Sequence, residues 1–313
     1  MARRIIVTGA LGHIGSKLIR HTDITSAFDE IIMIDDLSTQ RYTSVMNLPQ
    51  RTRYIMYQGS VSDVLVPELL DSDDVVVHLA ARTESSTSAH ESASLVKNNL
   101  ESTAHVLKVC KSADASVVFP SSSSVYEPSD MPVSETSSVR PVTSYAKCKA
   151  MEEELVSKFQ NSGLRARSLR FGTIFGISPG MRFHTAVNKF CWEAATGKPV
   201  EIWQHAHNQL RPYLSVGDAC AAISHVINSS CYGDGPINIA TTSATVQQVL
   251  AAIELSGVTV TTKIVESEAS AANSINLDTS LARRLGFTFV DNLLNGVGET
   301  LDQFRGIWRS RDS

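Results

Sequence analysis

The sequence predicts an α/β protein with a doubly wound parallel sheet and a smaller C-terminal α/β domain. Three observations support this prediction. Through the first 120 residues, short runs rich in Val and Ile alternate with longer segments of helical spacing, as expected for a sheet with helices on both faces. A glycine-rich turn directly follows the first run. The chain has 313 residues, which is enough for two domains.

Five strands are expected in this first part. Each is a short apolar run that suits a strand buried on both faces. Right-handed crossovers would place the C-terminal ends of these strands along one edge of the sheet, where ligands bind. The runs are Arg4 to Thr8, Glu30 to Ile34, Arg53 to Tyr57, Val75 to Leu79 and Ser116 to Phe119.

Two long helices are expected beside the sheet. One runs from about Ser88 to Lys111 and the other from about Thr143 to Phe159. The second contains three consecutive acids, Glu152 to Glu154, and a glycine, Gly163, follows its end.

The domain organisation follows from a change of pattern near residue 174, after which glycines and prolines separate shorter elements. We therefore expect a first domain over residues 1–174 and a smaller one over 175–313. Part of residues 211–242 is expected to return to the first domain.

The composition excludes several classes of function. Hydrophobic residues make up 42% of the chain, and 28 Lys and Arg against 32 Asp and Glu give a net charge of −4, which argues against a general grip on nucleic acid. Apolar runs are far shorter than the roughly 20 residues of a membrane helix, and the N-terminus lacks a signal-peptide pattern. The five cysteines are scattered, as in a reducing compartment. We expect a cytoplasmic protein.

The glycine-rich turn predicts a phosphate-binding site. Gly9, Gly12 and Gly15 are spaced G-x-x-G-x-x-G after the first strand. Gly9 permits the tight turn, Gly12 lets a pyrophosphate approach the backbone, and Gly15 lets the next helix pack closely on the strand. That helix begins at about His13 and Ile14 and supplies free N–H groups and a positive dipole end.

The second strand ends in two acids, Asp35 and Asp36. An acid at this place accepts hydrogen bonds from the ribose hydroxyls of a dinucleotide and repels a 2′-phosphate. Arg41 is six residues beyond Asp35, and no arginine follows immediately. The sequence therefore predicts NAD rather than NADP, with a solvated loop acid as the alternative.

A candidate base lies on the second long helix. Tyr145 and Lys149 are four residues apart and share one helix face. A free tyrosine, with a pKa of about 10, is a poor base at neutral pH, but a neighbouring ammonium favours the phenolate. A serine run at residues 121–124 ends the fifth strand, where a hydroxyl can bridge the reacting oxygen and the tyrosine. A surface helix and turn serines are the alternatives.

Together these motifs resemble the extended short-chain dehydrogenase/reductases of the NAD-dependent epimerase/dehydratase family, the nucleotide-sugar enzymes typified by UDP-galactose 4-epimerase. The resemblance covers nearly the whole chain. It implies a Rossmann fold for the first domain, NAD as cofactor and a nucleotide-diphosphate sugar as substrate. It also implies a homodimer formed through the helices near 88–111 and 143–160.

The resemblance also assigns roles to individual residues. The motif "SSxxVYG" matches residues 121–126 and places the catalytic hydroxyl at Ser122, beside Tyr145 and Lys149. The strand end "HLAA" matches residues 78–81, whose backbone lines the cofactor. The implied cofactor-binding residues are Gly9, Gly12, His13, Ile14, Gly15, Asp35, Asp36, Ser60, Val61, Leu79, Ala80, Ala81, Asn99, Tyr145 and Lys149.

Substrate contacts are implied by three later segments. Residues 169–176, "LRFGTIFG", resemble the strand that leads into the substrate domain, and "RPYLSVGDACAAI" resembles a segment whose arginine meets the nucleotide diphosphate. Residues 180–188 resemble a branch that handles varied sugars. The implied substrate-binding residues are Ser123, Thr173, Arg182, Asn188 and Arg211.

The chain departs from the family pattern at several positions. Ser60 stands where members often have Asp, which leaves adenine recognition open, and Glu127 replaces the usual glycine. Dehydratases have Asp-Glu where this chain has Ser123 and Ser124, which counts against dehydration and decarboxylation. Many UDP-hexose epimerases have Asn where Thr173 stands.

The sequence thus predicts an NAD-dependent nucleotide-sugar epimerase that acts at sugar C4 through a 4-keto intermediate. The alternative is a net dehydrogenase or reductase at C4, which the same residues would serve. A non-catalytic NAD sensor is disfavoured by the intact serine, tyrosine and lysine. His205 and His207 lack a third metal ligand at a usual spacing, so no metal is expected. Trp192 and Trp203 are expected to pack, with a nucleotide base as an alternative partner.

Overall fold

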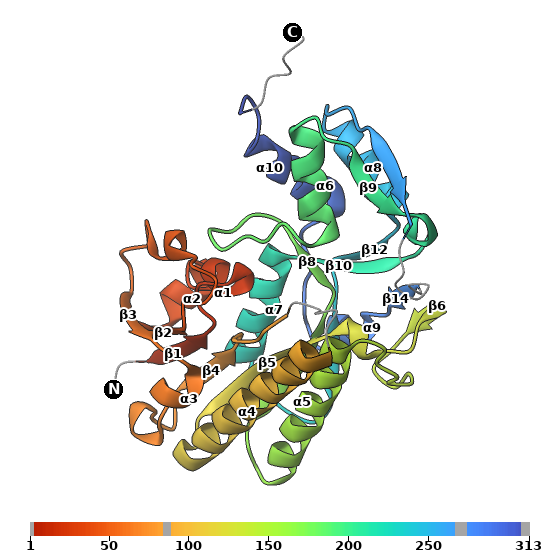
Figure 1. Ribbon diagram of the computed structural model, residues 1–313. Coiled ribbons are helices and arrows are strands. Elements are labelled where there is room, and N and C mark those ends of the chain that lie inside the picture. The colour runs from red at the N-terminus through yellow and green to blue at the C-terminus, as the bar shows by residue number, and fades with distance from the viewer. Residues whose placement is uncertain (1–2, 84–88, 267–273, 308–313) are drawn as a thin grey trace.

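The computed structural model describes residues 3–83, 89–266 and 274–307. Its larger part is a sheet of seven strands in the order β11-β7-β5-β4-β1-β2-β3, and every neighbouring pair is parallel (Figure 1). The chain winds outward from β1 in both directions, which confirms the doubly wound, Rossmann-like fold. The strands are β1 (Arg4–Thr8), β2 (Glu30–Asp35), β3 (Arg53–Gln58), β4 (Val75–His78), β5 (Ser116–Ser122), β7 (Ala166–Phe171) and β11 (Pro236–Ile239).

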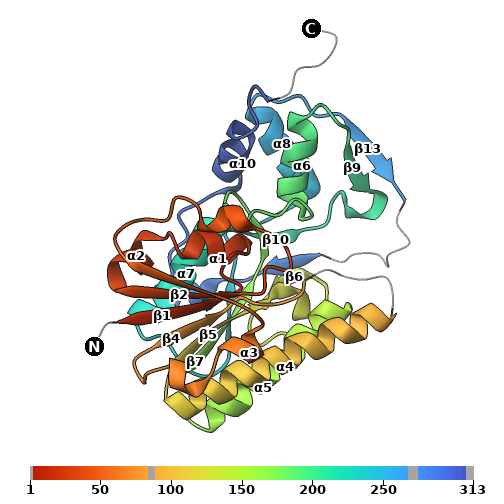
Figure 2. The same cartoon turned by 60° about the vertical axis from the view of Figure 1, so that its left-hand side comes forward.

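Helices cover both faces of the sheet and enclose two apolar cores. One core joins the sheet to helices that include α1, α2 and α7, and the other joins it to α3, α4 and α5. Figure 2 shows α4 and α5 lying side by side along one face. The bounds are α1 (His13–Leu18), α2 (Thr22–Ala27), α7 (Val216–Asn228) and α9 (Ser280–Arg284) on the first face, and α3 (Val61–Val64), α4 (Ala89–Ala113) and α5 (Ser144–Asn161) on the second.

The smaller part has its own core, built around three helices. A sheet of β12, β10 and β8 and a parallel pair of β9 and β13 complete it, while β6 pairs with β14 nearby. The bounds are β6 (Ser129–Val133), β8 (Thr173–Phe175), α6 (Ala186–Ala195), β9 (Val200–Trp203), β10 (Arg211–Ser215), β12 (Thr242–Ala244), α8 (Val246–Leu255), β13 (Thr262–Val265), β14 (Ile275–Leu277) and α10 (Leu293–Asp302), with short 3-10 turns η1 (Tyr42–Val45), η2 (Pro67–Leu69), η3 (Ser123–Val125) and η4 (Gln204–Ala206).

The chain crosses between the two parts more than once. It enters the smaller part through β8, and after β10 it returns to the larger part as α7 and β11. The five expected strands are present, but β5 continues to Ser122 and so includes the first two serines of the run. The long helices end at Ala113 and Asn161, about two residues later than expected, and Ser88, the expected start of the first, lies outside the described residues.

In the described ranges, no helix is both long and apolar enough to cross a bilayer.

Candidate active site

The glycine-rich turn leaves no room for side chains at two of its three glycines. Gly9 has φ +64°, and a Cβ there would lie 2.6 Å from the backbone N of Ala80. A Cβ on Gly15 would lie 2.5 Å from the carbonyl oxygen of Gly9. Gly12 is the N-cap of α1 and offers no side chain to its first-turn amides. The turn therefore fits the pyrophosphate of a dinucleotide.

A loop from the smaller part closes over this turn. A Cβ on Gly180 would lie 2.3 Å from the carbonyl oxygen of Leu11 and 2.5 Å from that of Gly12. The backbone N–H of Gly180 also donates to Ser16 Oγ at 2.9 Å. In the sequence, Gly180 marked a break in pattern and the start of the 180–188 segment. Nothing local shows that it meets a turn some 170 residues earlier.

Asp35 is bound to the glycine turn itself. Its carboxylate accepts hydrogen bonds from the backbone N–H of Leu11 and of Leu37, both at 3.0 Å, while Asp36 is exposed. Arg41 also reaches the turn, because its Nη1 lies 3.9 Å from the place of a Cβ on Gly12. Its six-residue distance from Asp35 had hidden this approach.

The other expected cofactor-binding segments line the same edge of the sheet. Leu79 and Ala80 follow β4, and their N–H groups bond to Thr8 just before the glycine turn. Ser60 caps α3, accepting from the N–H of Asp63 and donating to its carboxylate. Val61, which follows Ser60, is buried, and Ala81, which follows Ala80, is partly exposed.

The candidate catalytic residues converge from β5 and α5. Lys149 is buried, donates to the Pro120 carbonyl at 3.3 Å and has its Nζ 6.0 Å from the centre of the Tyr145 ring. Burial raises the pKa of Tyr145, and Lys149 opposes that rise. The Ser122 hydroxyl is at the end of β5, 2.8 Å from that of Ser124. The site thus holds a phenol, a cation and a hydroxyl.

Lys149 has a partner that the sequence analysis missed. The buried carboxylate of Glu152 lies 3.1 Å from its Nζ. The neighbouring acid Glu153 points elsewhere and pairs with Arg170 at 2.7 Å. A run of three acids was visible in the sequence, but only the packing of α5 separates their roles.

Tyr126 is not available as an alternative base. Its ring is buried, and its hydroxyl lies 2.6 Å from Asn238 Oδ1 and 2.8 Å from Arg170 Nη1. Burial raises the pKa of this phenol.

Three of the residues expected at the ligand sites also have side chains that hydrogen-bond within the protein. The amide of Asn99 bonds both backbone groups of Arg82 at 2.9 Å. Asn188 accepts from the N–H of Gly176 and donates to the carbonyl of Arg182. His13 Nε2 lies 2.8 Å from the Gly176 carbonyl, and burial lowers the pKa of this histidine to about 4. These side chains position the backbone around the site.

Two arginines bring positive charge to the substrate side. Arg182 hydrogen-bonds to Thr83 and is close enough to lower the pKa of both Tyr145 and His13. Arg211 begins β10, and burial lowers its pKa. Its guanidinium makes a long bond of 3.5 Å to Gln209.

Thr173 is the first residue of β8, and Ser123 is the first residue of η3. Thr173 is partly exposed and Ser123 is buried. Trp192 packs edge-on against Phe304, with ring centres 5.2 Å apart, and Trp203 is exposed on β9. Within the described ranges, no three His, Cys, Asp or Glu side chains gather as metal ligands would.

Comparisons with known proteins agree with this geometry. Residues 5–240 match the model of the "NAD dependent epimerase/dehydratase family". A relative described as "Uncharacterized UDP-glucose epimerase YtcB", from Bacillus subtilis, is 27% identical over 97% of this chain and 99% of its own length.

Two solved structures are similar over almost the whole chain. The UDP-N-acetylglucosamine 4-epimerase from Methanobrevibacter ruminantium M1, in complex with UDP-N-acetylmuramic acid, is 25% identical with a TM-score of 0.86, covering 97% of this chain and 98% of its own. MoeE5 in complex with UDP-glucose and NAD is 27% identical with a TM-score of 0.82, covering 96% and 98%. The predictions of an NAD-dependent enzyme and of an epimerase are confirmed. The chain belongs to the NAD-dependent epimerase/dehydratase family.

Proposed function

We propose that this NAD-dependent nucleotide-sugar epimerase inverts C4 of a UDP-sugar, with Tyr145 as its acid–base residue. The observation that carries the proposal is that Lys149 of α5 bonds to Pro120 near the end of β5, which carries Ser122, while its Nζ lies 6.0 Å from the centre of the Tyr145 ring. The matches to a UDP-glucose epimerase and to a UDP-N-acetylglucosamine 4-epimerase support the UDP-sugar and the position of inversion.

The residues divide the reaction between them. The glycine turn and Asp35 would hold NAD, which would supply the hydride acceptor for C4 of the sugar. Tyr145, as the phenolate, accepts the proton of the C4 hydroxyl and later gives it back. Lys149 favours the phenolate through its charge, and the Ser122 hydroxyl orients the reacting oxygen.

The nucleotide diphosphate must stay bound while the 4-keto sugar rotates to present the other face of its ring. Arg211 is suited to hold the diphosphate, because a half-buried guanidinium with a weak partner gains charge-assisted hydrogen bonds from phosphate oxygens. Arg182 is suited to the sugar end, since its charge acts on Tyr145.

A panel of UDP-, dTDP- and GDP-sugars, including UDP-glucuronate, tests the proposal. We expect NMR to show interconversion of the C4 epimers of a UDP-sugar, with no accumulation of NADH at 340 nm. Stoichiometric NADH with release of a keto sugar would instead establish the net dehydrogenase. A 4-keto-6-deoxy product would establish a dehydratase.

We further propose a cytoplasmic homodimer in which two copies pack through α4 and α5. The outer faces of these helices form an apolar groove with a charged rim, lined by Leu100, Glu101, Ala104, Met151, Glu154, Leu155 and Lys158. Met151→Asp would bury a charge in that interface. Light scattering should show a dimer for the natural chain and a monomer for the variant; a monomeric natural chain would contradict the proposal.

A further inference from the structure

A buried carboxylate, that of Glu152, lies beside Lys149, the cation that acts on the proposed base Tyr145. The carboxylate of Glu152 is 1% exposed. One oxygen lies 3.1 Å from Lys149 Nζ, and the other accepts a 2.6 Å hydrogen bond from the Thr103 hydroxyl on α4. A charge this deep is costly unless paired, so Glu152 and Lys149 form one ion pair inside the protein.

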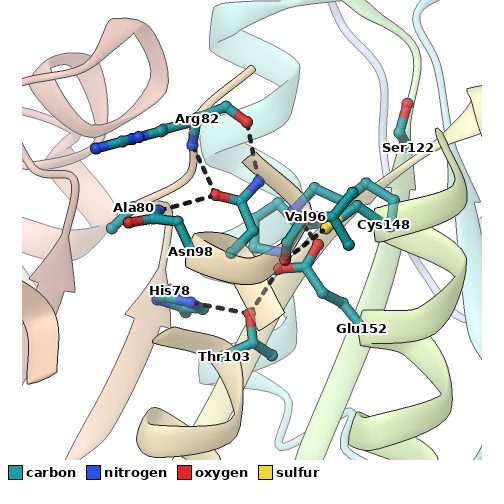
Figure 3. A network of polar contacts seen from close by, with 12 residues as sticks. His78, Ala80, Arg82, Val96, Asn98, Thr103, Ser122, Cys148 and Glu152 are labelled. Atoms are coloured by element: carbon teal, nitrogen blue, oxygen red, sulfur yellow. Dashed lines mark hydrogen bonds and ion pairs between the residues drawn. The ribbon is translucent and has the colours of Figure 1, made fainter. Parts of the chain in front are cut away.

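The acid is the end of a polar chain that runs to the glycine turn. Figure 3 shows dashed lines that join His78 to Thr103 and Thr103 to Glu152. His78 Nε2 lies 3.2 Å from Thr103 Oγ1. On its other side, His78 Nδ1 lies 2.8 Å from Thr8 Oγ1, and Thr8 Oγ1 accepts from the N–H of Ala80. The chain therefore joins α5, α4, β4 and β1, and ends one residue before Gly9.

The protons in this chain can be assigned. Thr103 donates to the carboxylate, so it must accept from His78 Nε2–H, and His78 Nδ1 then accepts from the Thr8 hydroxyl. The histidine is neutral in this arrangement, and burial lowers its pKa to about 3. His78 and Thr103 thus add no second cation beside Glu152. The negative charge of Glu152 therefore acts mainly on Lys149.

Among the described residues, the groups that act most strongly on Tyr145 are three charges and one thiol. From its own helix these are Lys149 and Glu152 together with the Cys148 thiol, and from the smaller part Arg182. Around Glu152 the neighbours other than Lys149 are neutral: Thr103 on α4 donates to its carboxylate, and His78 on β4 bonds Thr103. The Cys148 thiol lies beside both Glu152 and Asn99. Lys149 and Arg182 favour the phenolate, whereas Glu152 opposes it.

We propose that Glu152 is a positioning residue of this active site: its buried carboxylate fixes the ammonium of Lys149 and sets how much positive charge Lys149 presents to Tyr145. The proposal rests on the proposed function, in which Tyr145 is the base. It explains why a neutral buried chain ties Glu152 to the strand that precedes the glycine turn.

The pH profile separates this role from a purely structural one. Glu152→Gln keeps the shape and removes the charge. Tyr145 then ionises at lower pH because the opposing anion is gone, and Lys149 loses its proton at lower pH because its partner is gone. Both limbs of the kcat/KM profile should move toward acid by about one pH unit, with a lower maximum.

Two further variants control the result. Glu152→Asp keeps the charge and should return both limbs to their natural positions. Glu153→Gln, on the same helix as Glu152, breaks the ion pair with Arg170 of β7 and should lower the thermal midpoint without moving either limb. A Glu152→Gln enzyme that is folded and slower, with both limbs in place, would overturn the proposal.

A titration without turnover distinguishes this failure from failure of the proposed function. The phenolate absorbance of the NAD-bound protein is followed against pH, and the same titration of Tyr145→Phe is subtracted. We expect the midpoint of Tyr145 to fall by about one unit on Glu152→Gln. An unchanged midpoint refutes the role of Glu152, even if the enzyme acts on none of the sugars tested.

Discussion

The two sides of the site differ in how their polar groups are used. On the cofactor side, Asp35 is bonded to the glycine turn and Lys149 is paired with Glu152 inside the protein. On the substrate side, Arg211 is half-buried, and in the described structure its hydrogen bond is a long one to Gln209. On the cofactor side, the charged groups Asp35 and Lys149 already have hydrogen-bond or ion-pair partners within the protein. On the substrate side, the charge of Arg211 is available for a ligand.

This difference indicates that the cofactor side orients the catalytic base, whereas the substrate side binds the substrate. A preorganised cofactor side holds the base without reorganisation during the reaction. A half-buried cation with a weak partner forms stronger, charge-assisted hydrogen bonds when an anion binds. We therefore expect changes on the cofactor side to affect turnover, and changes on the substrate side to affect substrate affinity.

The largest expected effect is that of Tyr145→Phe. Loss of the phenol removes the acid–base group, which is typically worth about 10²–10⁴-fold in rate, and little volume changes. We expect kcat to fall by that factor in the NMR assay, while calorimetry shows NAD and UDP-sugar binding within a few-fold of the natural chain. Near-natural turnover would show that the base lies elsewhere.

A second prediction concerns His13, which joins the glycine turn to Gly176 of the smaller part. Because its pKa falls to about 4 on folding, from about 6.5 in the unfolded chain, the unfolded state binds a proton first as pH falls. Its contribution to stability is complete above pH 6.5 and is lost between about 6.5 and 4, by roughly 2–3 kcal/mol.

Urea unfolding of the natural chain and of His13→Gln at pH 7 and pH 4.5 checks this. The glutamine amide can keep the bond to Gly176 and does not titrate, so the variant should lose about 2 kcal/mol less than the natural chain between the two pH values. His78 titrates in both proteins and cancels in the difference. Equal losses would show that His13 is already protonated in the folded state at pH 4.5.

Sequence patterns predicted the parts of the site that depend on local geometry. The glycine spacing located a turn in which side chains do not fit, and the spacing of Tyr145 and Lys149 placed both on one helix face. Short apolar runs located the buried strands, because a strand covered on both faces must be apolar along its length.

Contacts between distant segments could not be predicted in the same way. The approach of Gly180 to Gly12, and the chain from Glu152 through Thr103 to His78, arise from packing of separate elements. Asn188 on α6 was expected to contact the substrate, yet its amide bonds the backbone of Gly176 and Arg182 in the segment before that helix. Residue type alone does not reveal which polar groups the protein itself satisfies.

The smallest effect is expected on the substrate side, from Arg211→Ala. A charge-assisted hydrogen bond contributes about 1.5–3 kcal/mol, so we expect UDP and the UDP-sugar to bind roughly 10- to 100-fold more weakly, with NAD affinity unchanged. Arg140→Ala is the matched control, because that arginine is exposed and its pair with Glu127 lies at the surface, where such pairs contribute little. Calorimetry with UDP measures both. If Arg211→Ala weakened NAD as much as UDP, the guanidinium would be supporting the fold of both sides, and the division between a satisfied cofactor side and an available substrate side would be wrong.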